Sequence, residues 1–89
     1  MSYEAEFAAS LWLYSAGGWH FVTVPEEYAP SVAYAFGRTP VDAVVDGHAW
    51  RTSVWREKSG RTIMAVPKAA RGDKGHGDEV RVRLRFGTV

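Results

Sequence analysis

The chain contains three histidines and no cysteine, which limits the chemistry that its side chains can perform. His20, His48 and His76 lie in separate segments, at spacings typical of neither a helical nor a ribbon metal motif. No serine lies in a Gly-x-Ser-x-Gly motif. We therefore predict no metal, no cofactor and no catalytic residue. An enzyme that uses His20 or His48 beside an acid brought close by folding stays an open alternative.

Four tryptophans in 89 residues are the richest feature of the sequence. Most of them are expected in the core, because each can bury on the order of 200 Å². Trp12 and Tyr14, however, share a strand face with glutamates, and Trp55 shares one with Arg51. Aromatic rings on a mixed face are typical of residues that anchor a partner or stack a ligand. We predict an interaction surface of Trp12, Tyr14, Trp55 and Arg51, with burial of both faces in a barrel or a dimer as the alternative.

A row of arginines near the end of the chain suggests a second kind of site. Arg81, Arg83 and Arg85 alternate with apolar residues and so share one face of a strand. The row would span about 13 Å at roughly 3.3 Å per residue, a geometry that can follow phosphates. Lys68 and Arg71 would extend this nucleic-acid surface. The alternative is a solvated face that protects a strand edge.

A mainly β domain must position these residues. Alternation predicts one long strand over Tyr3–Tyr14, and a turn at Ala16–Gly18 leads to an antiparallel return over Trp19–Val24. Pro25 favours a turn, followed by a short helix over Ser31–Phe36.

Hairpins continue the pattern in the second half of the chain. Three strands are expected around Val41–Val45, over His48–Arg56 and over Arg61–Val66, with Asp46-Gly47 as a strong turn signal. One helical turn at Pro67–Arg71 and a flexible glycine-rich loop precede the last strand. The order ββαβββαβ, about six strands with one or two short helices, favours an antiparallel sheet that closes or half-closes into a barrel.

Length and composition bound the class of protein. With 46% hydrophobic and 24% charged residues, the chain is expected to form a single globular domain over residues 1–89. No apolar run reaches membrane-spanning length, and Glu4 and Glu6 stand where a secretory signal is basic, so we expect a cytoplasmic protein without membrane contact. Residues 1–50 carry a formal charge of −5 and residues 51–89 carry +6. Such halves can attract one another, which favours a homodimer.

Several segments together resemble one family. They are Gly18-Trp19-His20-Phe21-Val22, Val24-Pro25-Glu26, the run from Asp46 to Ser53, the run from Val66 to Arg71, and Gly77-Asp78-Glu79-Val80. Over nearly its whole length the chain is similar to DUF1905, a domain of unknown function. The resemblance implies a double-split β-barrel, an architecture shared with the swapped-hairpin DNA-binding domains of AbrB-like and MazE-like proteins. It implies no activity and no site residues.

The residues and the resemblance together predict a non-catalytic binding module whose ligand or partner is unknown. Nucleic-acid binding through the arginine row is the first alternative. A histidine-based enzyme is the second.

Overall fold

The computed structural model describes residues 2–14, 17–30 and 37–87, and within them the chain forms one seven-stranded antiparallel sheet. Its strands are β1 (Ser2–Ser10), β2 (Trp12–Leu13), β3 (His20–Val24), β4 (Arg38–Val45), β5 (His48–Arg56), β6 (Thr62–Ala65) and β7 (Glu79–Gly87). The same residues include a 3-10 helix, η1 (Glu26–Tyr28), and a short α-helix, α1 (Lys68–Arg71). No helix in this part of the chain is long and apolar enough to cross a bilayer.

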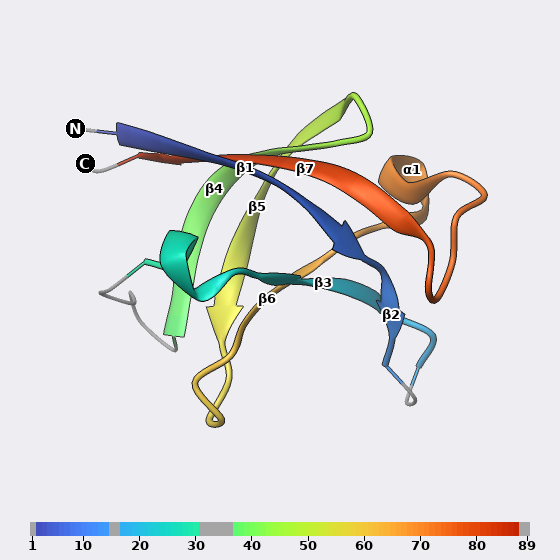
Figure 1. Cartoon of the computed structure of the whole chain (residues 1–89), viewed down its shortest axis with the longest axis horizontal. Helices are drawn as coiled ribbons and strands as arrows, with labels where there is room; N and C mark the ends of the chain where they lie inside the picture. Colours follow the sequence, from blue (N-terminus) through green and yellow to red (C-terminus); the bar gives the residue numbers. More distant parts are fainter. Residues whose placement is uncertain (1, 15–16, 31–36, 88–89) are drawn as a thin grey trace.

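The sheet curls into a half-barrel because its two outermost strands are consecutive in the chain. The strand order is β1-β7-β4-β5-β6-β3-β2, so β1 and β2 occupy opposite ends of the sheet although only Leu11 separates them. Figure 1 shows β1 running beside β7 and then continuing into β2 beside β3. The mainly β, barrel-like fold predicted from the sequence is confirmed.

The prediction of one unbroken strand over Tyr3–Tyr14 is wrong at Leu11. There the backbone bonds to the turn before β7: the Leu11 N–H donates to the Asp78 carbonyl (2.8 Å), and the Gly77 N–H donates to the Leu11 carbonyl (2.8 Å). The Leu11 side chain is only 1% exposed, so the bend also fills the core. Splitting this strand raises the count to seven in the described ranges.

The Asp46-Gly47 turn forms as predicted, and the glycine-rich loop before β7 makes specific contacts with its neighbours. Asp46 and Gly47 both have positive φ, 47° and 88°, as a two-residue hairpin turn between β4 and β5 requires. The loop predicted as flexible is instead tied to its neighbours, since Lys74 Nζ donates to Asp46 Oδ2 (2.8 Å) and to the Glu79 carbonyl (2.7 Å). The helix predicted over Ser31–Phe36 lies outside the described residues.

The core lies on the concave, inner face of the curled sheet. Alternation in β7 is confirmed, with apolar side chains buried inside and arginines exposed outside. Ala70 of α1 is buried in the same core, and Tyr28 of η1 stacks on Phe7 with ring centroids 6.0 Å apart. The fully buried core side chains are Leu11, Val22, Val41, Val45, Val54, Met64, Val80, Val82 and Leu84. Each Å² of apolar surface removed from water contributes roughly 25 cal/mol to stability. The inner face, which buries most of these side chains, is therefore the main source of stability.

Candidate functional site

Strand register divides the outer face of the sheet into two halves. The charged half covers β1, β7, β4 and the start of β5, and presents Glu4, Glu6, Asp42, Arg51, Glu79, Arg81, Arg83 and Arg85. The aromatic half covers the end of β5, β6, β3 and the β2–β3 hairpin, and presents Trp12, Tyr14, Trp19, Phe21, Trp55, Ile63 and Ala65. The aromatic half is hollowed into a pocket.

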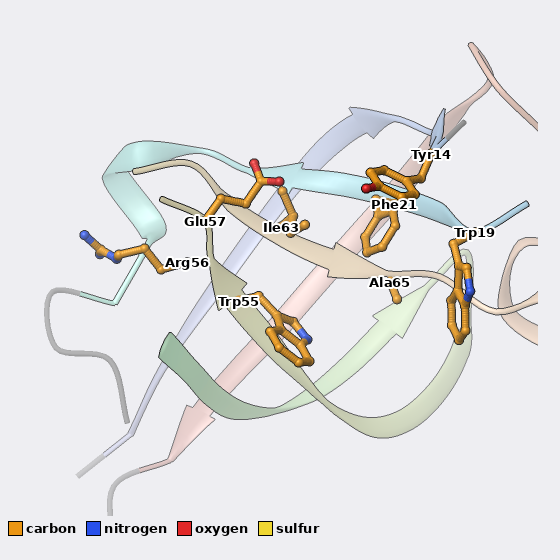
Figure 2. A pocket seen from close by; sticks show the side chains of 8 residues that line it. All are labelled: Tyr14, Trp19, Phe21, Trp55, Arg56, Glu57, Ile63 and Ala65. Atoms are coloured by element: carbon orange, nitrogen blue, oxygen red, sulfur yellow. The ribbon is translucent and has the colours of Figure 1, made fainter. Parts of the chain in front are cut away.

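This aromatic pocket has a volume of about 580 Å³ and is shown in Figure 2. It is lined by Tyr14, Trp19, Phe21, Trp55, Arg56, Glu57, Ile63 and Ala65. Cross-strand pairing sets the floor, because Trp55 lies opposite Ile63 and Phe21 lies opposite Ala65. Ala65 lies between the rings of Trp19 and Trp55, and its small side chain leaves the space between them open (Figure 2).

Three of the lining rings are exposed. Trp19 is 60% exposed, Tyr14 51% and Trp55 43%. A hydrogen bond from the Tyr14 N–H to the Trp19 carbonyl (2.8 Å) closes the hairpin and holds two of these rings at one rim of the pocket. Exposed large aromatics gathered at one place are typical of an interaction site.

Trp12 supports the floor of the pocket from the side. Its ring stacks on Phe21 at a centroid distance of 5.0 Å, and its Nε1–H donates to Thr23 Oγ1 (3.1 Å). The guanidinium of Arg61 lies 4.7 Å from the Trp12 ring centroid. Phe21 in turn meets Tyr14 edge-on, at 6.2 Å and 76°. These contacts fix Phe21, and Trp12 is therefore a packing residue beside the pocket.

Arginines border the pocket where Trp55 projects. Arg38, the cross-strand neighbour of Trp55, holds its guanidinium 4.8 Å from the Trp55 ring centroid. Arg56 donates from Nη2 to the Pro30 carbonyl (2.6 Å), and Glu57 accepts a hydrogen bond from Arg61 Nε (2.7 Å). Gly37 precedes Arg38 with φ of 72°, and a Cβ there would lie 3.2 Å from the Arg56 carbonyl oxygen. Glycine therefore lets the chain enter β4 close to β5.

In the charged half, opposite charges face each other across the strands. Arg83 lies opposite Glu6, and Arg85 lies between Glu4 and Asp42. Asp42 also pairs with Arg51, at 3.0 Å. Opposite charges in such positions attract by a few tenths of a kcal/mol to about 1 kcal/mol each. The arginine row thus lies among carboxylates.

Lys68 and Arg71 lie on α1, which contacts β4 and β5. Their cationic groups donate to loop carbonyls: Lys68 Nζ to Gly72 (2.8 Å) and Arg71 Nη1 to Lys74 (2.9 Å). Lys68 Nζ also lies 3.7 Å from Asp73 Oδ1. These contacts hold both groups against the loop after α1.

The structure brings together only part of the predicted interaction surface. Tyr14 and Trp55 line the same pocket, Trp12 lies beside it, and Arg51 lies in the charged half. Sequence reasoning missed Trp19 and Phe21. Residues 19, 21 and 23 alternate along the returning strand, and the pairing of Trp12 with Phe21 places them on the Trp12 face. The register of the β2–β3 hairpin is therefore the signal that identifies Trp19 and Phe21.

The histidines lie apart from the aromatic pocket. Neither the aromatic pocket nor a second one, between the β3–η1 segment and the β5–β6 turn, is lined by a histidine. His76 Nδ1 accepts a hydrogen bond from the Leu13 N–H (2.9 Å), and the His48 ring lies 5.9 Å from that of Trp50. Within the described ranges no three His, Asp or Glu side chains cluster as metal ligands. The acid-assisted histidine site considered above is not found at these two pockets.

Fold and site together define a small antiparallel half-barrel domain with a solvent-facing aromatic pocket. Comparison with known families matches residues 7–84 to DUF1905, a domain of unknown function. The chain belongs to this family, as its segments predicted. No curated protein matches the chain.

Proposed function

We propose that the chain is a non-catalytic binding module and that its aromatic pocket receives a ligand with a flat, largely apolar group. The observation that carries this proposal is the gathering of three exposed rings, Tyr14, Trp19 and Trp55, around one hollow. A volume of about 580 Å³ lies in the usual range for ligand pockets, roughly 300–1,000 Å³. Flat groups stack well on such rings, and burial of the ring faces supplies the binding free energy.

The side chains beneath the rings favour a preformed pocket. Phe21 is held by Trp12 and Tyr14, and Ile63 is only 8% exposed. A ligand therefore meets a floor that is already packed, and less free energy is spent on ordering it.

Titration with small planar aromatic compounds tests this proposal. Tryptophan fluorescence of the full chain is expected to change saturably with indole, naphthalene or purine derivatives. Trp55→Ala should weaken binding by about tenfold, since an aromatic contact contributes roughly 0.5–1.5 kcal/mol beyond area burial and the buried area of the ring is lost as well. Arg83→Ala, in the charged half, is the matched control and should leave the affinity unchanged. Equal affinity of Trp55→Ala and the parent chain would contradict the proposal.

The arginine row is the second candidate site, for nucleic acid. Arg81, Arg83 and Arg85 are all exposed on one face of β7. With Lys68 and Arg71 they would contact phosphates, and binding would then weaken steeply with salt. Removal of Arg83 should reduce the salt dependence if this surface is used.

We also propose a cytoplasmic location and a homodimer. The opposite charges of residues 1–50 and residues 51–89 support a self-complementary dimer that leaves the aromatic pocket open. Light scattering is expected to give about twice the chain mass of 9.9 kDa at high concentration. A mass near that of one chain at every concentration would remove the dimer.

A further inference from the structure

We infer that the aromatic pocket binds single-stranded nucleic acid, with bases stacked on Trp55, Trp19 and Tyr14 and with phosphates beside Arg38 and Arg56. This inference rests on the proposed function, because it assigns an occupant to the same pocket. It uses the aromatic half of the outer face and does not require the arginine row.

The rings supply a platform for more than one base. Trp55 projects from β5, whereas Tyr14 and Trp19 project from the β2–β3 hairpin, at the other side of Ala65 (Figure 2). Every base has a π-face, so stacking on such rings tolerates any sequence and contributes about 1–3 kcal/mol per base. A duplex hides its base faces in its own stack, which favours a single strand as the occupant.

The charge around the rings suits a polyanion. Four basic side chains lie around the pocket and the adjoining β5–β6 turn, namely Arg38, Arg56, Lys58 and Arg61. The lining contains one carboxylate, Glu57, which is already paired with Arg61 at 2.7 Å. Glu26 lies with Arg61 in the second pocket. In the charged half, by contrast, four arginines share the surface with four carboxylates.

Arg38 and Trp55 combine the two kinds of contact. The guanidinium lies 4.8 Å from the ring centroid, so a base stacked on Trp55 would bring its own backbone phosphate close to Arg38. Guanidinium groups bind phosphate oxygens through paired N–H donors. A peptide of acidic residues alone would satisfy Arg38 and Arg56 but would leave the three rings uncovered, whereas a single strand supplies phosphates and flat bases together.

Fluorescence anisotropy of a labelled twelve-nucleotide oligothymidylate tests the inference. With the full chain we expect saturable binding whose log affinity falls linearly with log salt concentration. Trp55→Ala and Trp19→Ala should each weaken binding by about tenfold. Arg38→Gln should lower the salt slope by about 0.7, the value for one lost phosphate contact on a single strand. Arg83→Gln removes the same charge from the charged half and should change neither quantity.

Variants that keep the fold make the result decisive. Trp55→Phe retains a stacking ring and should bind more tightly than Trp55→Ala, and circular dichroism checks that each variant is folded. Binding of duplex DNA or of thymidine monophosphate as tightly as the oligomer would overturn the inference. A larger loss of affinity for the oligomer in Arg83→Gln than in Arg38→Gln would overturn the inference as well.

The outcome also separates this inference from the proposed function. If planar compounds bind and depend on Trp55 while the oligomer does not bind, the pocket stands and the nucleic-acid occupant is overturned. If neither binds, both are overturned.

Discussion

The two halves of the outer face show two ways of treating the solvent side of one sheet. In the charged half, strand register sets side chains of opposite charge beside one another, and Asp42 pairs with Arg51 at 3.0 Å. In the aromatic half, Trp19 and Trp55 turn large apolar surfaces toward solvent. Exposed apolar rings mark the part of a strand face that a ligand can cover, whereas neighbouring side chains of opposite charge already attract one another within the fold.

Removal of Phe21 is expected to have the largest effect on stability. Phe21→Ala takes away the ring on which Trp12 and Tyr14 rest, and should lower the free energy of unfolding by about 3 kcal/mol. Urea denaturation of the variant and of Arg83→Ala measures the contrast, with the arginine variant expected within about 0.5 kcal/mol of the parent chain. Equal losses of unfolding free energy in Phe21→Ala and Arg83→Ala would contradict the claim that the aromatic half contributes more to stability than the charged half.

Asp46 links the β4–β5 turn to β7, and its loss should cost about 1.5 kcal/mol at neutral pH. Its carboxylate accepts hydrogen bonds from the Arg81 N–H (2.8 Å) and from Lys74 Nζ (2.8 Å). Asp46→Asn keeps the shape and tolerates the positive φ of 47°, so the loss reports the charge. Thermal denaturation of both proteins measures this difference.

The same pair of proteins should differ with pH. The hydrogen bond from the Arg81 backbone, and then that from Lys74, lower the pKa of Asp46 in the folded chain. A lowered pKa stabilises the fold fully above the unfolded value, and this stabilisation is lost as the pH falls through the folded value. The stability difference between the parent chain and Asp46→Asn should therefore shrink in acid. A difference that stays constant down to strongly acidic pH would contradict this assignment.

Trp12→Phe is expected to cost about 1 kcal/mol, because it keeps a stacking ring and removes the hydrogen bond to Thr23. Thr23→Val removes the other partner of this hydrogen bond. The double variant should therefore lose less unfolding free energy than the sum of the two single losses. Such coupling in a double-mutant cycle shows that the bond is made. Additive losses would show that Trp12 is not held through Thr23.

The exposed pair of Arg51 and Asp42 should have the smallest effect. Their side chains are 63% and 56% exposed, so solvent screens the attraction, and a double-mutant cycle is expected to give about 0.5 kcal/mol or less. Added salt should reduce this value further. A coupling above about 2 kcal/mol would show that the charged half is held more tightly than its exposure allows.

The sequence predicted the fold well where the side-chain pattern is local. Alternation in β7 and the Asp46-Gly47 turn depend on neighbouring residues, and both appear in the structure. The break at Leu11 depends on hydrogen bonds to Gly77 and Asp78, more than sixty positions away, so no local pattern announces it.

The candidate site was predicted less completely for the same reason. Alternation along the strands predicts Tyr14 and Trp55 as interaction residues, and both line the aromatic pocket. Alternation along β5 places Arg51 and Trp55 on the same face but does not show that Arg51 lies in the charged half. That position depends on the pairing of β5 with β4 at Arg51 and with β6 at Trp55. The contribution of Trp19 likewise depends on the hairpin that returns it beside Tyr14.

Chemical-shift mapping of the ¹⁵N-labelled chain tests the central claim most directly, because it observes both halves in one experiment. Separate titrations with planar aromatic compounds and with the oligothymidylate should move the indole N–H signals of Trp19 and Trp55. The indole signal of Trp50, which packs against the core, and the backbone signals of Arg81–Arg85 should stay in place. Movement of the arginine signals while both exposed indoles remain unchanged would contradict the account and assign binding to the charged half.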